Sequence, residues 1–251
     1  MTIDSLINSL IKEKYIMSIW QVGSSTREKV YNDIDILITH SHTDNEILKK
    51  IIETRVRELF FNHKVITIDD AVRIFYNVEI SIAIYSHSDL CDLLKTILKG
   101  KMIYGNVRQW AIGYWIPEAL LHDLQTGKCL FHMQIQDDIK CIISKNTDIL
   151  FRAIINNLMQ EIEIKSKLRK KTKTNYIEKK LIERDLILAI VRIAFAIDKL
   201  MFGGYKRLEE KRQLLSDKGR QIYRMAEEIL NPSNNLTNYY EKLRELVENQ
   251  N

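Results

Sequence analysis

The sequence predicts an α+β protein in two parts, a region of mixed strands and helices followed by a region of helices alone. Up to about residue 137, short segments of alternating apolar and polar residues are interspersed with amphipathic helical stretches. Beyond it the strand patterns vanish, and apolar residues recur at helical spacing. The boundary is therefore predicted near residue 140, giving domains 1–140 and 141–251.

The N-terminal elements follow from capping residues and periodicity. Asp4 can cap a helix over 5–14, and an apolar stretch from 18 to 22 predicts the first strand. A polar loop follows, and apolar alternation resumes at residue 33. Asp44 can cap the next helix. Later elements are expected as strands at 65–68, 72–76 and 78–85 and as helices at 86–98 and 117–126.

Three long apolar stripes predict the C-terminal helices, over 147–167, 176–202 and 205–230, with a short last helix over 236–248. Gly203 and Gly204 should end the second helix. The only dense basic run (Lys165, Lys167, Arg169, Lys170, Lys171 and Lys173) is read as a solvated face, with RNA or phosphate contact as the lesser alternative. Near the glycine pair, substrate contact and surface ion pairing explain Asp198, Lys199 and Lys206 equally well.

Composition limits the class of protein. With 251 residues, 45% hydrophobic and 28% charged, the chain reads as soluble and globular, and no apolar run reaches the roughly 20 residues that span a bilayer. The start lacks the basic region of a secretory signal. Three cysteines without a Cys-x-x-Cys pair predict buried free thiols and a cytoplasmic location. The net charge of +5 suits a nucleotide as well as an RNA.

The most informative motif is Gly23-Ser24 followed by Asp33-Ile34-Asp35-Ile36. Side chains alternate along a strand, so Asp33 and Asp35 share one face. Paired carboxylates repel each other unless a cation lies between them, and Mg²⁺ binds through one or two carboxylates plus phosphates. Gly23 allows close approach of phosphate, and the Ser24 hydroxyl can donate to it.

Two further features complete this motif. Arg27 and Lys29, in the same loop, can offset the charge of a triphosphate, although solvated loop charges are an equal alternative. A third acid, Glu79, begins a later strand in which apolar residues alternate with Glu79, Ser81 and Ala83.

The motif resembles the nucleotidyltransferase superfamily typified by DNA polymerase beta. Its signature is an apolar residue, Gly-Ser or Gly-Gly, a spacer, then Asp-apolar-Asp/Glu-apolar, with a third carboxylate on a later strand. This resemblance implies a small mixed-sheet catalytic domain and a helical domain on the acceptor side. It also implies that Asp33, Asp35 and Glu79 bind two Mg²⁺ ions, that Glu79 alternatively acts as base, and that Gly23 and Ser24 hold the terminal phosphates.

The two-domain layout is similar to that of the antibiotic nucleotidyltransferases. The resemblance therefore implies transfer of a nucleoside monophosphate, AMP from ATP or another nucleoside triphosphate, to a small hydroxylated acceptor such as an aminoglycoside or lincosamide. No membrane partner is expected. The alternatives are transfer to a protein or RNA, and a catalytically silent module that senses a nucleotide, which Glu28 in the phosphate loop keeps open. Whether the pocket forms within one chain or across a homodimer also stays open.

Overall fold

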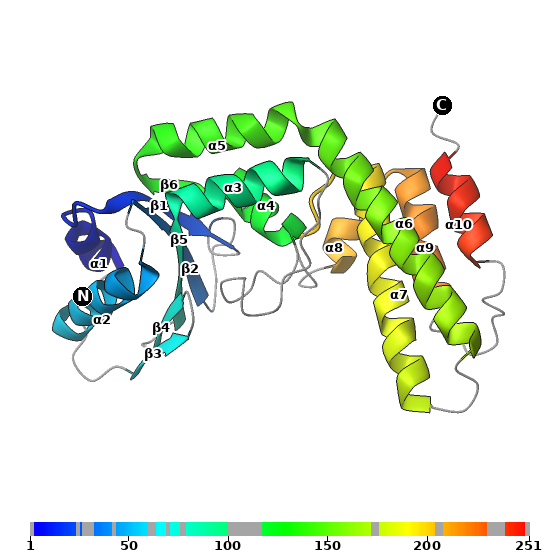
Figure 1. Ribbon diagram of the computed structural model, residues 1–251, viewed down its shortest axis with the longest axis horizontal. Coiled ribbons are helices and arrows are strands. Elements are labelled where there is room, and N and C mark those ends of the chain that lie inside the picture. Colours follow the sequence, from blue (N-terminus) through cyan, green and yellow to red (C-terminus); the bar gives the residue numbers. More distant parts are fainter. Residues whose placement is uncertain are drawn as a thin grey trace. The chain divides into compact units, whose positions relative to one another are not determined.

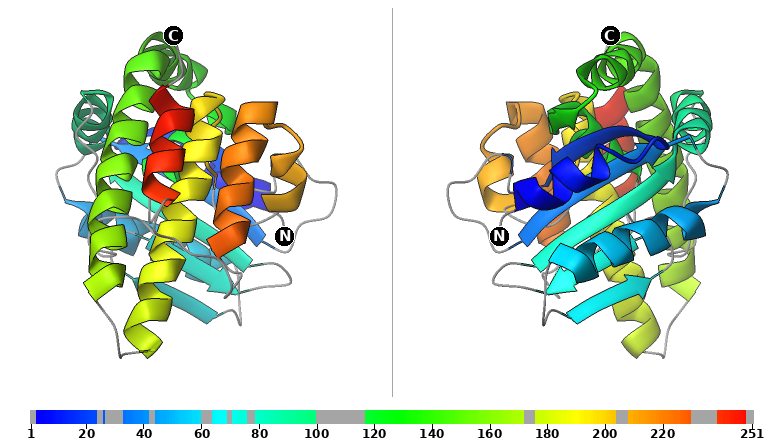
Figure 2. Two further views of the ribbon diagram at one scale, coloured as in Figure 1. Left: turned by 90° about the vertical axis from the view of Figure 1, so that its right-hand side faces the viewer. Right: turned by 90° about the vertical axis from the view of Figure 1, so that its left-hand side faces the viewer.

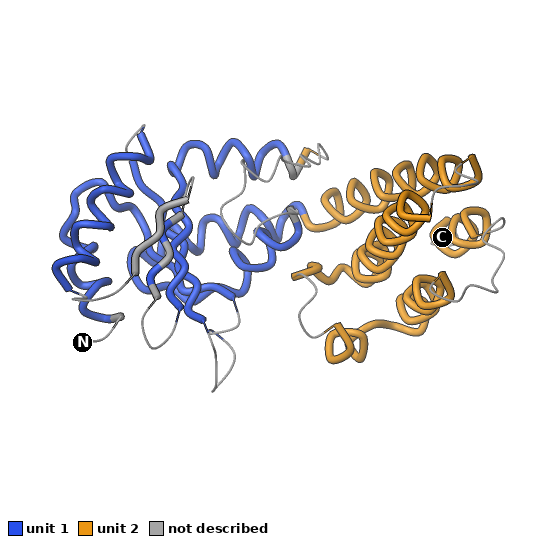
Figure 3. The backbone as a smooth tube through the Cα atoms, turned by 90° about the horizontal axis from the view of Figure 1, so that it is seen from below, with its two compact units in different colours: residues 1–98, 103–146 blue, residues 99–102, 147–251 orange. Residues whose placement is uncertain are grey.

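The computed structural model divides into two compact units, drawn in different colours in Figure 3. Unit 1 comprises the described residues up to Leu98 and 117–146, and unit 2 comprises Lys99 and the described residues from 147 onward. The structure describes residues 3–23, 26, 33–41, 44–59, 64–68, 71–75, 79–99, 117–171, 176–203, 208–229 and 239–248.

A mixed sheet of six strands forms the centre of unit 1, in the order β3-β4-β5-β2-β1-β6. Strands β2 and β5 run parallel at its middle, and the other neighbouring pairs are antiparallel. The strands are β1 (Ile16–Val22), β2 (Asp33–His40), β3 (Lys64–Ile68), β4 (Ala71–Phe75), β5 (Glu79–Ser86) and β6 (Lys128–Phe131).

Helices cover both faces of this sheet (Figure 1). On one face lie α1 (Ile3–Leu10) and α2 (Asn45–Leu59), which are in front of the strands in the right-hand view of Figure 2. On the other lie α3 (His87–Leu98), α4 (Pro117–Thr126) and α5 (Met133–Lys145). The isoleucines that alternate along β2 and β5 pack with α1 and α2 into one apolar core.

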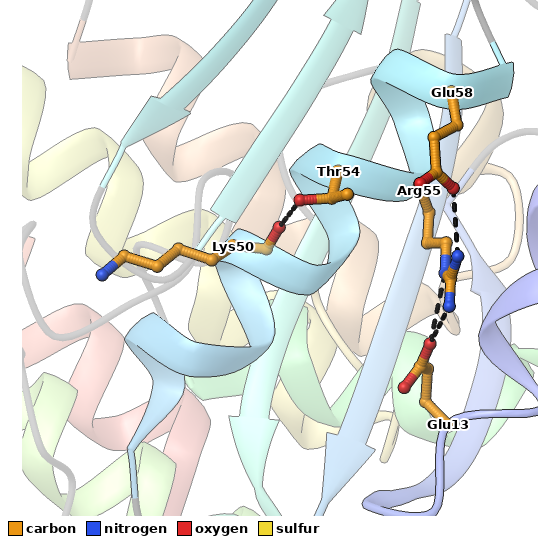
Figure 4. Close-up of polar contacts among 5 residues, drawn as sticks. All are labelled: Glu13, Lys50, Thr54, Arg55 and Glu58. Atoms are coloured by element: carbon orange, nitrogen blue, oxygen red, sulfur yellow. Dashed lines mark hydrogen bonds and ion pairs between the residues drawn. The ribbon is translucent and has the colours of Figure 1, made fainter.

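A side-chain contact confirms the predicted start of α2, whereas α1 already begins at Ile3, so the prediction that Asp4 caps it is wrong. The Asp44 carboxylate accepts a hydrogen bond from the Glu46 backbone N–H at 2.8 Å, which caps α2. The first helix ends at Leu10, earlier than predicted, and the connection to β1 is held to α2 by Arg55. Its Nη2 lies 2.8 Å from Glu13 Oε1, and its Nη1 lies 3.0 Å from Glu58 Oε2 (Figure 4).

All the regular elements in the described residues of unit 2 are helices. Its elements are α6 (Thr147–Lys171), α7 (Tyr176–Ile197), α8 (Leu208–Arg212), α9 (Asp217–Ile229) and α10 (Tyr239–Glu248). Helix α7 packs against both α6 and α9, and α10 contacts α6 and α9 (Figure 2, left). Helix α7 is central in this unit, which explains why its residues from Ala189 to Ala196 are all buried.

Besides the bounds of α1, the structure differs from the sequence prediction in the helices of unit 2 and in the division between the units. Helix α7 ends at Ile197 and not at 202, and the stretch predicted as one helix over 205–230 contains α8 and α9. The division between the units falls after Asn146 rather than at 140, because α5 packs against β1 and β6.

The α+β class is confirmed, with a mixed sheet followed by helices. All three cysteines are free, but Cys91 and Cys129 are only half-buried and Cys141 is exposed, so the prediction of buried thiols is wrong. Burial raises the pKa of the Cys91 and Cys129 thiols. None of the helices in the described ranges is both long enough and apolar enough to cross a membrane.

Candidate active site

The register of three strands brings the predicted acids to one edge of the sheet. Strand β1 runs antiparallel to β2, so its end lies beside the start of β2, with Val22 opposite Asp35. Strands β2 and β5 are parallel and start together, with Asp33 opposite Glu79 and Asp35 opposite Ser81. Residues paired in this way point to the same face of a sheet. The three acids therefore lie on the same face of the sheet, near the beginnings of the neighbouring strands β2 and β5.

That face is opposite the core formed with α1 and α2. Asp33 and Asp35 are half-buried, whereas the intervening Ile34 and the following Ile36 are buried in the core. Glu79 is half-buried in the same way at the start of β5. The buried isoleucines thus fix the direction of the acidic side chains, because a strand alternates its side chains between two faces.

Gly23 is fitted to the Asp35 carboxylate. Its φ is +71°, a backbone conformation that residues other than glycine rarely adopt. A Cβ built on Gly23 would lie 2.3 Å from Asp35 Oδ2. The turn that follows is closed by Thr26, whose Oγ1 donates a hydrogen bond to the Gly23 carbonyl at 2.8 Å. Only glycine leaves the space that the Asp35 side chain occupies.

The three acids are aligned, but their side chains do not form a compact ligand set. Among the described residues, no group of three His, Cys, Asp or Glu side chains is placed to hold a metal ion. Ser81 Oγ donates a long hydrogen bond of 3.5 Å to Glu79 Oε1. Carboxylate oxygens are the donors that Mg²⁺ prefers, and it needs only one or two of them besides phosphate. The donor chemistry therefore fits magnesium, without a preformed three-acid cage.

The predicted phosphate-loop residues Ser24, Arg27 and Lys29, and also Glu28, lie outside the described residues. The same holds for Trp110 and for the neighbouring aromatic residues Tyr114 and Trp115. Of the predicted site, the structure thus brings together Gly23, Asp33, Asp35 and Glu79.

The turn after α4 supports this edge, a contact that was not predicted from the sequence. Gly127 packs against the end of β1, where an added Cβ would lie 3.1 Å from Val22 Cγ1. The carbonyl of Gly127 accepts hydrogen bonds from Gln136 Nε2 at 2.5 Å and from Lys140 Nζ at 3.1 Å. These hydrogen bonds hold the turn to α5, and the turn packs against β1, the strand that precedes Gly23.

Histidines that the sequence left without a role have local contacts in unit 1. His122 Nδ1 lies 3.3 Å from Asp123 Oδ1, and the His132 ring packs edge-on against Phe131. His132 precedes α5 with φ at 57°. Neither contact reaches the acidic edge, so both histidines are assigned to local structure.

Part of the basic run of α6 is paired with acids within unit 2. Lys165 pairs with Asp185 at 2.6 Å, and Arg169 pairs with Glu183 at 2.8 Å. Burial raises the pKa of Glu183, but hydrogen bonds from Lys180 and Arg169 outweigh it and leave that pKa below its ordinary value. These contacts agree with a solvated helix face, and they weaken the case for a dedicated polyanion surface.

Two residues near the predicted glycine break have structural partners. Asp198 accepts hydrogen bonds from the Ser216 backbone N–H at 2.7 Å and from its hydroxyl at 2.6 Å, immediately before α9. Lys199 Nζ lies 2.6 Å from Asp148 Oδ1. The third residue of this group, Lys206, lies outside the described residues.

The chain matches no protein-family model, and no curated protein is significantly similar to it. The residues that bear on its function are therefore those of the acidic edge, Gly23, Asp33, Asp35 and Glu79.

Proposed function

We propose that the protein is a magnesium-dependent nucleotidyltransferase that moves a nucleoside monophosphate, AMP from ATP, onto a hydroxyl group with release of pyrophosphate. One observation carries this proposal. Gly23 leaves space for the Asp35 carboxylate at the point where the register sets Asp33 beside Glu79. A positive φ at glycine is common in hairpin turns, and the feature that sets Gly23 apart is the space that it leaves for the Asp35 carboxylate.

In this proposal Asp33 and Asp35 hold Mg²⁺, and Glu79 either completes that site or accepts the proton of the acceptor hydroxyl. Bound magnesium neutralises phosphate charge and stabilises the attacking and leaving oxygens. A bond forms between the acceptor oxygen and the α-phosphorus, and the bond from that phosphorus to the pyrophosphate oxygen breaks. The backbone at the Gly23 turn, free of a side chain, can approach the phosphates closely.

A small hydroxylated molecule, such as an aminoglycoside or lincosamide, remains the proposed acceptor. Transfer to RNA has less support because Lys165 and Arg169 are held in part-buried ion pairs with acids, unlike cations in exposed pairs, which exchange partners at little cost. Transfer to a protein hydroxyl is tested by the same assay.

A second candidate function is a silent module that binds a nucleotide without turning it over. It is favoured by one specific observation: the described acids form no three-residue metal cluster. A sensing module needs only the phosphate contacts, whereas in-line transfer needs the metal and the nucleophile to be positioned together.

The test uses the full chain with Mg²⁺ and ATP labelled at the α-phosphate, incubated with pools of aminoglycosides, lincosamides, transfer RNA or cell lysate. Label is expected to move to an acceptor, and Asp35→Asn, Asp33→Asn and Glu79→Gln should each lower the rate by about 100-fold or more. The matched control is Asp137→Asn, an exposed acid on α5, which should leave the rate unchanged.

Binding of labelled ATP without transfer to any pool would favour the silent module. Equal rates in Asp35→Asn and Asp137→Asn would overturn the assignment of the acidic edge. Thermal unfolding of each variant checks that the lost rate does not reflect lost fold.

A further inference from the structure

The helical unit contains a surface hollow that nucleotidyl transfer does not explain. It has a volume of about 250 Å³ and lies between the first turns of α6 and the last turn of α7. Its floor is apolar: Phe151, Ile155 and Ala196 line it and are almost completely buried, with Ile197 beside them. Drug-sized ligands occupy pockets of about 300–1,000 Å³, so this hollow suits a smaller molecule, such as one ring with a short polar arm.

Charged groups surround this floor. Asp148, Arg152 and Lys199 line the hollow, two cations against one acid. Lys199 Nζ lies 2.6 Å from Asp148 Oδ1, and the hydrogen bond from Lys199 holds the pKa of Asp148 below its ordinary value. Within the described ranges, Arg152 makes one hydrogen bond, a long one of 3.4 Å from Nε to the Asp148 carbonyl. Its guanidinium therefore keeps donors for an anionic group.

The backbone conformation of Lys199 is a second observation about this residue, independent of its ion pair with Asp148. Helix α7 ends in a Schellman motif, in which the Leu200 N–H donates to the Phe195 carbonyl at 2.9 Å and the Lys199 N–H donates to the Ala196 carbonyl at 3.1 Å. Lys199 occupies the left-handed position of this motif, with φ at 55°. Glycine is the usual residue there because a Cβ is penalised. A lysine at this position has a conformational cost that glycine would not have, which is consistent with a role for its side chain.

We propose that this hollow is a binding site for a small organic anion that carries an apolar ring, with the ring on Phe151 and the anionic group at Arg152 and Lys199. The apolar floor provides the affinity for the ring. The excess of cations provides selectivity for an anion over its neutral analogue. This site is formed within unit 2 alone and does not depend on the acidic edge of unit 1.

The probe is phenylacetate, with phenylacetamide as the uncharged control of the same shape. Binding to the nucleotide-free full chain is followed by NMR of labelled isoleucine methyl groups, assigned by Ile155→Val and Ile197→Val. Saturable shifts at Ile155 and Ile197 are expected with phenylacetate, and binding of phenylacetamide should be at least about tenfold weaker. Equal shifts with both compounds, or none with phenylacetate, would overturn the proposal.

Lys199→Gly separates binding from stability. The variant relieves the left-handed strain and removes an exposed ion pair of small worth, so its Tm is expected to equal or exceed that of the parent protein. Its affinity for phenylacetate should fall at least about tenfold, and Arg152→Ala should show the same loss. The matched control is Lys179→Ala, an exposed lysine near the opposite end of α7, with unchanged affinity.

A clear fall in the Tm of Lys199→Gly would show that the lysine serves the fold, and would contradict the argument from strain. Unchanged phenylacetate affinity in both Lys199→Gly and Arg152→Ala would contradict the assignment of the anion-binding groups. Because no nucleotide is present, a failure here is distinct from a failure to detect nucleotidyl transfer.

Discussion

Replacing Gly23 with alanine tests the fit between the Gly23 turn and Asp35 most directly. The new Cβ would lie 2.3 Å from Asp35 Oδ2 and 3.1 Å from its carboxyl carbon, closer than nonbonded atoms approach. The φ of +71° adds a penalty of about 1–2 kcal/mol for a residue with a side chain. The Asp35 carboxylate must therefore move or the turn must change its conformation.

The backbone penalty alone lowers the stability by about 1–2 kcal/mol, which corresponds to a decrease in Tm of about 2–8 °C, and relief of the clash with Asp35 adds to this loss. Calorimetry of Gly23→Ala and of Gly203→Ala, a glycine whose φ is not positive, measures the difference. Displacement of Asp35 should also weaken binding of Mn²⁺, followed by electron paramagnetic resonance, by about tenfold. A Gly23→Ala protein with the stability and Mn²⁺ affinity of the parent would refute the reasoning.

Substitutions at three other contacts give further predictions. Asp198→Ala should cost about 1–2 kcal/mol in urea unfolding, and its effect should be less than additive with Ser216→Ala, because both variants lose the hydrogen bond between the Ser216 hydroxyl and Asp198. The pKa of Glu183 lies below its ordinary value of 4.5, so this group stabilises the fold at higher pH and loses that contribution as the pH falls through its lowered pKa. The stability difference between the parent and Glu183→Gln should therefore be constant near neutral pH and shrink below about pH 4.5, whereas a constant difference down to pH 3 would contradict this. Arg55→Leu should lower the urea midpoint at low salt more than at high salt, since the residue bridges to Glu13 near the surface; no dependence on salt would argue against the ion pair.

Local patterns predicted most elements well because their signals are carried by neighbouring residues. Asp44 caps α2 as expected, and α4 stops where Thr126 and Gly127 predicted it. Helix α7 was predicted too long because apolar residues continue to Phe202. In the structure Phe202 is buried after the helix has ended, with its ring edge-on to Phe195 at 5.6 Å. Apolar periodicity indicates which residues are buried, and in this chain the buried residues continue beyond the end of α7.

The candidate site shows the same division between local and long-range information. The alternation around Asp33, Asp35 and Glu79 was sufficient to predict that each acid lies near the beginning of a strand, on its polar face. It could not predict which strands become neighbours, and the pairing of Asp33 with Glu79 joins segments separated by two strands and a helix. The contact of Gly127 with the end of β1 could not be predicted either, because it also joins segments that are distant in the sequence.

By itself, the sequence determined the α+β class, the two-part layout and the acids that define the proposed chemistry. These follow from periodicity, caps and spacing, which depend on residues a few positions apart. Only the tertiary structure decided that Gly23 makes room for Asp35 and that Lys199 stands in a glycine position beside Asp148. Both depend on packing between distant segments, where excluded volume and backbone conformation, and not residue pattern, set which side chains can meet.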